Sequence, residues 1–96
     1  MKPLTSEEVD SQLKELDHWT FENDQIKKDF SFDNFKEALA FMVKVGFEAE
    51  DLGHHPNWSN VYNSVSVQLN THDADNKVTK KDIQLAKAID KIYKNN

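Results

Sequence analysis

The stretch SNVYNSVSVQLNTHD, residues 59–73, decides the fold, because it is the clearest β segment of the chain. Its side chains fall into two alternating sets, which is the period of a strand. One set is mostly apolar and consists of Val61, Asn63, Val65, Val67, Leu69 and Thr71. The other is mostly polar and consists of Tyr62, Ser64, Ser66, Gln68, Asn70 and His72. The pattern fits one long strand, or two strands broken around residues 60–63, in a sheet covered on one face only.

Upstream of this segment the sequence predicts a short helix and a hairpin. Residues 5–16 carry apolar side chains at helical spacing, and Thr5 or Ser6 can cap the first turn. Aromatic residues then alternate with polar ones on both sides of Asn23-Asp24. This pattern predicts two strands joined by a turn at that pair.

The longest predicted helix spans residues 34–52. Asn34 and Glu37 have the spacing of a capping box at its start. An apolar stripe keeps helical spacing through Phe35, Ala38, Leu39, Met42, Val45, Ala49 and Leu52. Phe41, Val43 and Phe47 fall off this stripe, so the helix is apolar on more than one side. That excess indicates either deeper burial in the chain's own core or a subunit interface.

A last helix is expected to start at Thr79, with Asp82 as its capping partner at the third helical position. The order of elements is then helix, two strands, helix, one or two strands, helix. Strand pairs joined by short turns, with helices between them, indicate an α+β fold. We expect a two-layer sandwich, with a four-stranded antiparallel sheet and three helices on one face (α-β-β-α-β-β-α).

Bulk composition excludes several classes of protein. The 96 residues show no linker or repeat, so residues 1–96 are expected to form a single domain. The net charge of −5 argues against a nucleic-acid binder. The absence of cysteine removes disulfides, thiolate nucleophiles and cysteine-based zinc sites. No apolar run approaches the roughly 18 residues of a membrane helix, and the polar start of the chain is unlike a signal peptide. These features predict a cytoplasmic protein.

The most informative residues for chemistry are His54 and His55, which stand between Gly53 and Pro56. The glycine suits the left-handed position just past a helix end, and the proline disfavours helical geometry before it. Both histidines are therefore expected in a short extended connection after the helix. If this connection lies beside the end of the β segment, His72 joins them in one pocket. Histidine side chains titrate near neutral pH, so such a set can both donate and remove protons.

Two acidic residues, Glu50 and Asp51, precede the histidines at the end of the predicted helix. Negative charge at a helix C-terminus opposes the helix dipole, at a cost of roughly 0.3–1 kcal/mol per charge. Local rules are often broken at functional sites, so these acids are candidates for orienting the histidines. They fit equally well an acidic, solubilising surface beside exposed histidines.

Alternative interpretations remain for single residues. Neighbouring histidines rarely point at one ion, and the spacing offers no third ligand, so a metal site is disfavoured. Taken alone, His72 fits a hydrogen-bonding residue at a strand end, and Asp82 fits a helix cap. Trp58 and Tyr62 alone are typical of aromatic residues in a core or at its rim.

Taken together, these residues resemble the pterin-4a-carbinolamine dehydratases. The family pattern is an acidic residue, three spacers, His-His-Pro, an aromatic residue six positions on, a histidine ten beyond it, and then an aspartate. The matching residues of this chain are Glu50, His54, His55, Pro56, Tyr62, His72 and Asp82. The resemblance covers about residues 12–93 and includes the stretches FSFDNFKEALAFMVKV and VTKKDIQLAKAID.

The resemblance implies a lyase that removes water from 4a-hydroxytetrahydropterin to give quinonoid dihydropterin, without metal or cofactor. This reaction belongs to tetrahydrobiopterin recycling, downstream of the pterin-dependent aromatic amino acid hydroxylases. His55 would be the main acid/base residue, while His54 and His72 would bind the ring edge and share proton transfer. Glu50 would orient a histidine, and Asp82 would help to hold His72. The implied substrate contacts are Pro56, Trp58, Tyr62, Thr71 and Asp73.

A second interpretation is protein binding through helix 34–52. Some members of the family are also dimerisation partners of a homeodomain transcription factor. The doubly apolar helix would suit such a factor, a partner hydroxylase, or self-association into a dimer or tetramer. We favour self-association on physical grounds. The intact set of three histidines favours the enzyme, because a pure binding module has no need of it.

Overall fold

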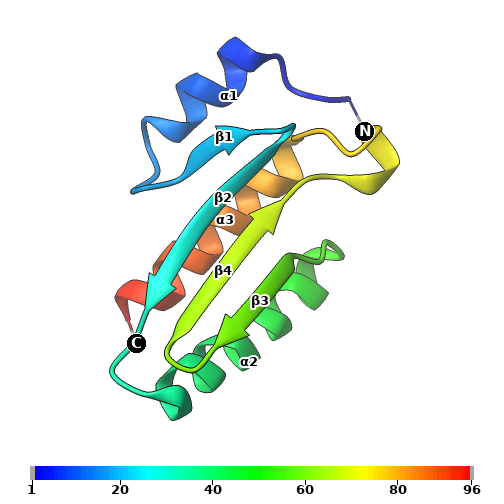
Figure 1. The fold of residues 1–96 in the computed structure, drawn as a ribbon. Coiled ribbons are helices and arrows are strands. Elements are labelled where there is room, and N and C mark those ends of the chain that lie inside the picture. The colour runs from blue at the N-terminus through cyan, green and yellow to red at the C-terminus, as the bar shows by residue number, and fades with distance from the viewer. Residues whose placement is uncertain (1, 96) are drawn as a thin grey trace.

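The chain folds into two layers, with helices packed against one side of a four-stranded antiparallel sheet (Figure 1). The structure is a computed structural model that describes residues 2–95. The strands lie in the order β1-β2-β4-β3. The expected α+β sandwich is confirmed. The elements are α1 (Ser6–Leu13), β1 (Thr20–Glu22), β2 (Gln25–Ser31), α2 (Phe35–Leu52), β3 (Asn57–Val61), β4 (Ser64–Leu69), the 3₁₀ turn η1 (His72–Ala74) and α3 (Lys80–Lys94).

Two hairpins build the sheet. Asn23 and Asp24 connect β1 to β2 with φ values of 54° and 60°, the left-handed geometry that two-residue hairpin turns require. Residues 59–73 contribute to two strands, because Tyr62 and Asn63 form the turn between β3 and β4. This turn corrects one expectation. Val61 does not share the buried face of β4, and it is 76% exposed.

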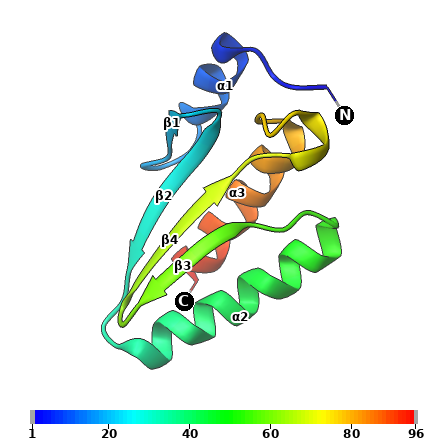
Figure 2. The same ribbon diagram turned by 45° about the vertical axis from the view of Figure 1, so that its right-hand side comes forward.

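The helix-facing side of β4 follows the predicted alternation, since Val65, Val67 and Leu69 are all buried. The sheet, α2 and α3 share one core, with Phe30 and Phe41 among its largest fully buried side chains. Figure 2 shows α2 and α3 running along the same side of the sheet, with β3 as one sheet edge.

Helix α2 carries two apolar stripes. The single stripe predicted from the sequence contained residues from both of them. The core-facing stripe is Ala38, Phe41, Val45 and Ala49, all buried. A second stripe at a spacing of four residues faces outward and consists of Phe35, Leu39, Val43 and Phe47, which are 45–69% exposed. The helix is therefore apolar on two sides, as predicted. No helix within residues 2–95 is both long and apolar enough to cross a membrane.

The helix starts follow the sequence closely. Thr5 and Glu8 form a complete capping box on α1, and Thr79 and Asp82 form one on α3. Asn34 caps α2 by accepting a hydrogen bond from the backbone N–H of Glu37. Helix α1 is shorter than predicted and ends at Leu13.

Candidate active site

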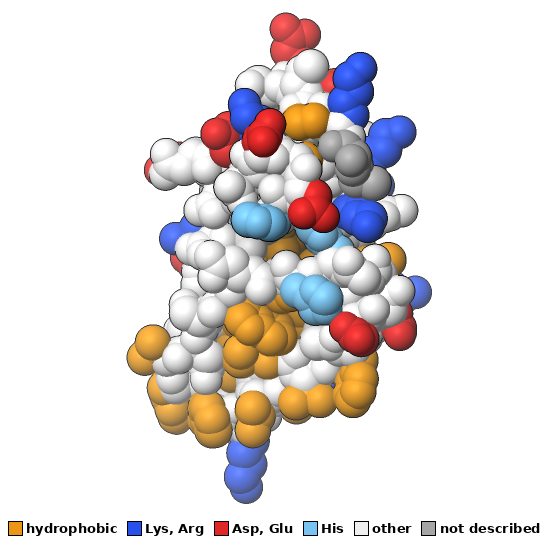
Figure 3. Space-filling model, turned by 90° about the vertical axis from the view of Figure 1, so that its right-hand side faces the viewer, with side chains coloured by type: hydrophobic (Ala, Val, Ile, Leu, Met, Phe, Trp, Pro, Cys, Tyr) orange, Lys and Arg blue, Asp and Glu red, His pale blue; other side chains and the backbone are white. Residues whose placement is uncertain are grey.

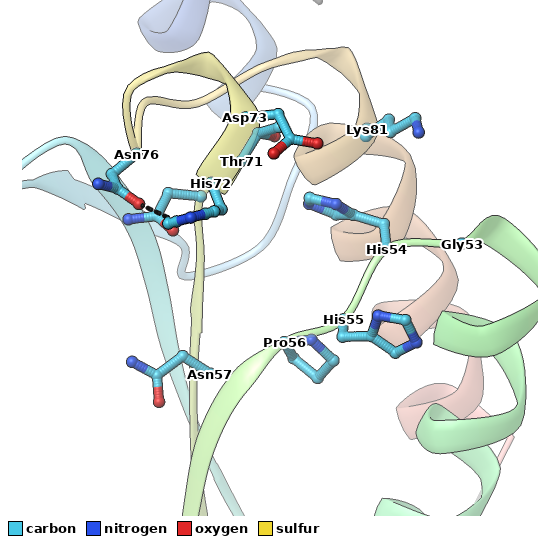
Figure 4. Close-up of a pocket in the computed structure, with 11 residues that line it drawn as sticks. Gly53, His54, His55, Pro56, Asn57, Thr71, His72, Asp73, Asn76 and Lys81 are labelled. Atoms are coloured by element: carbon cyan, nitrogen blue, oxygen red, sulfur yellow. Dashed lines mark hydrogen bonds between the residues drawn. The ribbon is translucent and has the colours of Figure 1, made fainter.

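Four elements meet at one end of the sheet and enclose a cleft of about 520 Å³ (Figure 4). They are the end of α2, the start of β3, the segment after β4 and the start of α3. Pockets that hold small ligands have volumes of about 300–1,000 Å³, so the cleft suits a small heterocycle. Its lining residues are Gly53, His54, His55, Pro56, Asn57, Asn70, Thr71, His72, Asp73, Asn76 and Lys81.

His54 is the buried histidine of the cleft. Gly53 ends α2 in the left-handed conformation, with φ 64°, as the sequence predicted. The backbone N–H of His54 then bonds the carbonyl of Ala49, which turns the chain inward. The His54 residue is only 8% exposed, and its Nε2 contacts Oδ1 of Asp82.

Asp82 is fully buried beneath His54. Its other oxygen, Oδ2, accepts the backbone N–H of Thr79 at 2.9 Å and the hydroxyl of Thr71 at 2.8 Å. The two threonine hydroxyls lie 2.7 Å apart. The residue that local rules explain as a helix cap therefore also holds a histidine of the cleft. This contact corrects our expectation that Asp82 holds His72.

His55 is the exposed neighbour of His54. Its Nε2 lies 2.8 Å from Oε1 of Glu50, and the two side chains are 66% and 78% exposed. A pair this open to water adds little to stability. It joins His55 to Glu50, the residue expected to orient a histidine.

His72 was expected at the end of a strand, but it is the first residue of η1. Its Nδ1 lies 3.1 Å from Oδ1 of Asn76, a contact drawn in Figure 4. The pocket nevertheless gathers all three predicted histidines from two separate stretches of chain. In Figure 3, histidine side chains gather around the middle of one face of the molecule, above a broad apolar area.

The predicted substrate contacts separate into two groups. Pro56, Thr71 and Asp73 line the cleft. Trp58 and Tyr62 do not belong to its lining. Trp58 points toward α2, since a Cβ added at Gly46 would lie 3.9 Å from its ring. Tyr62 lies at the β3–β4 turn, at the opposite end of β3 from the histidines.

Comparison with known proteins decides the family. The family model for pterin 4 alpha carbinolamine dehydratase matches residues 2–92. The chain belongs to this family. A relative from Christiangramia forsetii that carries the family's name is 49% identical over 96% of this chain and 94% of its own length. Another from Opitutus terrae is 49% identical over 93% of this chain and 92% of its own.

The fold of this dehydratase-family chain also matches a solved structure. The crystal structure of a transcriptional coactivator/pterin dehydratase from Brucella melitensis superposes with a TM-score of 0.92 at 38% identity. The match covers 96% of this chain and 99% of that one. The family assignment confirms the expectation of a dehydratase enzyme.

Sequence reasoning missed four residues that line the cleft of this dehydratase, namely Asn57, Asn70, Asn76 and Lys81. Three of them are adjacent to a noted residue: Asn57 follows His-His-Pro, Asn70 precedes Thr71, and Lys81 precedes Asp82. Position alone could have suggested these three but not Asn76, and no local pattern marks an asparagine or lysine as a ligand contact. No group of three histidine, cysteine or acidic side chains suited to a metal ion occurs among residues 2–95.

Proposed function

We propose that this protein dehydrates a 4a-hydroxytetrahydropterin to the quinonoid dihydropterin and water, by histidine acid–base catalysis. The observation that carries the proposal is the convergence of three imidazoles on one cleft, two of them held by carboxylates. Membership of the dehydratase family supports the choice of substrate.

The reaction needs one proton donor and one proton acceptor. A base removes the proton from N5, and the electron pair of that bond forms the N5–C4a double bond. The C4a–O bond breaks, and the departing oxygen takes a proton from an acid and leaves as water. General acid–base catalysis of this kind contributes about 10²–10⁴-fold. Three histidines around a flat ring can supply both groups.

We assign the main acid/base role to His55, whose imidazole is oriented by Glu50 and lies at the open side of the cleft. His54 and His72 contact the ring edge and share proton transfer, and Asp82 supports His54. Pro56, Thr71 and Asp73 are the proposed contacts to the rest of the pterin. We leave Trp58 and Tyr62 out of this contact set, because neither lines the cleft.

The test is stopped-flow absorbance of 4a-hydroxytetrahydropterin decay. Wild type should accelerate the decay, and His55→Ala should lose about 10²-fold or more of that acceleration. His18→Ala is the matched control, because His18 is exposed and outside the cleft. Full activity in His55→Ala would refute the assignment of that residue. No acceleration by folded wild-type protein would refute the proposed function.

We also propose that the protein self-associates into a dimer or tetramer through the outward face of α2. Phe35, Leu39, Val43 and Phe47 form this apolar face on one helix. Val61 and Tyr62 at the β3–β4 turn are also exposed, at 76% and 62%. Large exposed apolar patches usually mark interaction sites.

Sedimentation of wild type and Phe47→Glu tests this association. Wild type should sediment as an oligomer at micromolar concentration, and Phe47→Glu should shift toward monomer. A wild-type monomer would refute self-association. It would favour the second candidate, in which the same face binds a transcription factor or a hydroxylase. The description of the Brucella protein as a transcriptional coactivator supports the first of these partners.

A further inference from the structure

Two buried threonine hydroxyls lie behind His54 and are not needed to explain the three histidines. Thr71 is 7% exposed, and Thr79 and Asp82 are each 0% exposed. Thr71 comes from the segment after β4, whereas Thr79 caps α3. The hydroxyls contact each other at 2.7 Å, and Thr71 contacts Asp82 at 2.8 Å. A helix cap alone would require only Thr79 and Asp82.

The positions of the protons in this cluster follow from counting donors. Each threonine hydroxyl has one proton to donate. Thr71 donates its proton to Oδ2 of Asp82, so Thr79 must be the donor in the bond between the two hydroxyls. The oxygen of Thr79 in turn accepts the backbone N–H of Lys81 at 3.3 Å. All donors therefore point in one direction, toward the Asp82 carboxylate.

The same counting fixes the tautomer of His54. A carboxylate only accepts hydrogen bonds, so the Nε2 of His54 that meets Oδ1 of Asp82 must carry a proton. The neutral imidazole then has its unprotonated nitrogen at Nδ1. Within residues 2–95 this atom has no hydrogen-bond partner, yet no fully buried side-chain nitrogen or oxygen lacks one. The Nδ1 atom therefore keeps some contact with solvent, and the His54 side chain lines the cleft.

We propose that Thr71 and Thr79 are positioning residues that lock the Asp82 carboxylate, so that His54 offers Nδ1 to the cleft as a fixed proton acceptor. This inference rests on the proposed function for its chemical meaning. Nδ1 of His54 takes the N5 proton, the freed electron pair turns the N5–C4a single bond into a double bond, and His55 supplies the proton to the departing hydroxyl as the C4a–O bond breaks. The single proton of Thr71 is used within the cluster, so its hydroxyl acts on His54, and Thr71 contacts the pterin only as an acceptor or by van der Waals contact.

The first test is ¹⁵N NMR of the imidazole nitrogens in the free protein, which needs no variant and no activity. Neutral His54 should show a protonated Nε2 and an unprotonated Nδ1. A protonated Nδ1 in the wild-type protein would overturn the proposal. Because no pterin is present, this outcome is independent of whether the protein is a dehydratase.

The second test removes one hydroxyl while keeping the side-chain shape. Thr71→Val should produce a mixture of His54 tautomers and lower kcat about 10-fold, the effect expected for a lost hydrogen bond to a charged group. Thr71→Ser retains the hydroxyl and should restore both the tautomer and most of kcat. Thr20→Val, on exposed β1, is the matched control and should change neither.

The outcomes separate positioning from a merely structural role. A Thr71→Val protein that loses thermal stability but keeps the wild-type tautomer and kcat would overturn the proposal. Tautomer loss in Thr71→Val, together with a wild-type protein that does not dehydrate pterin, would support the positioning role and refute the proposed function.

Discussion

The same four-residue capping device occurs twice in this chain, with different consequences. Thr5 and Glu8 exchange hydrogen bonds at the start of α1, and Thr79 and Asp82 do so at the start of α3. The first box lies at the surface, whereas both residues of the second are fully buried. Each box satisfies orphan backbone N–H groups of its helix. The second also hydrogen-bonds to side chains from other elements, because Asp82 meets His54 and Thr71.

The difference shows how a local motif becomes part of a site. A carboxylate has room for several hydrogen bonds, and the backbone of Thr79 uses only part of the capacity of Asp82. Burial removes water, so the remaining capacity must be met by protein groups. His54 and Thr71 meet it, and His54 lines the cleft. At the surface, water meets the same need for Glu8, and the box remains only a cap.

A second buried carboxylate on α3 gives the sharpest test of whether burial alone explains Asp82. Asp90 accepts Lys28 at 2.8 Å and the Trp19 indole N–H, far from the cleft. Asp90→Ala would leave the Lys28 ammonium buried without its partner and should cost about 3–5 kcal/mol of unfolding free energy. The kcat of the folded fraction should not change. Urea unfolding measures the stability of Asp90→Ala, and the stopped-flow assay measures its kcat. Asp29→Ala is the control, because Asp29 is exposed. A large fall in kcat would show that loss of any buried carboxylate on α3 lowers activity, and that Asp82 has no special role.

Asp82→Asn compared with Glu8→Gln tests the two caps directly. The asparagine keeps the shape of the cap but can no longer accept from all its partners, so His54 loses its fixed tautomer. We expect about 10²-fold lower kcat, the lower end of the range for acid–base catalysis. Glu8→Gln should leave kcat at the wild-type value. Equal activity of the two variants in the stopped-flow assay would contradict a special role for the second box.

Replacing the threonine of each capping box should produce a smaller difference between the two boxes, measured as the loss of unfolding free energy. Loss of an N-cap hydroxyl costs about 0.5–2 kcal/mol. Thr5→Ala should fall near the lower limit, because water replaces the exposed hydroxyl. Thr79→Ala should fall near the upper limit, because Thr71 and the N–H of Lys81 both lose a buried partner. Chemical denaturation of both variants measures the difference between their losses of unfolding free energy. Equal losses would mean that burial does not strengthen the cap at Thr79.

Sequence reasoning succeeded where the cause of a structure is local. The turn at Asn23-Asp24, the alternation of Val65 and Val67, and the cap at Thr79 each depend on neighbouring residues. Family resemblance added the three histidines as one set, and the structure gathers them in one cleft.

Prediction failed where two distant parts of the chain decide the outcome. Nothing near Asp82 in sequence shows that its carboxylate meets His54 instead of His72, because that contact spans 28 residues. Phe41 was assigned off the main stripe of α2, since the helix has two apolar sides and only packing selects the core-facing one. The outward position of Val61 depended on the exact place of the β3–β4 turn.

The smallest expected effect is a pH dependence of the exposed box. The hydrogen bond from the backbone N–H of Thr5 lowers the pKa of Glu8 below its ordinary value of 4.5, with a further contribution from the Thr5 side chain. A carboxyl whose pKa is lower in the folded state stabilises the fold above the unfolded-state pKa, and this stabilisation is lost as pH falls through the folded-state value. Glu8→Gln should therefore melt slightly below wild type at pH 7, and the gap should close on acidification below pH 4.5. Because Glu8 is fully open to water, the gap at pH 7 should be the smallest of the four effects. A gap of the same size in strong acid would mean that the charge of Glu8 contributes nothing, and that the exposed box acts through its hydrogen-bond geometry alone.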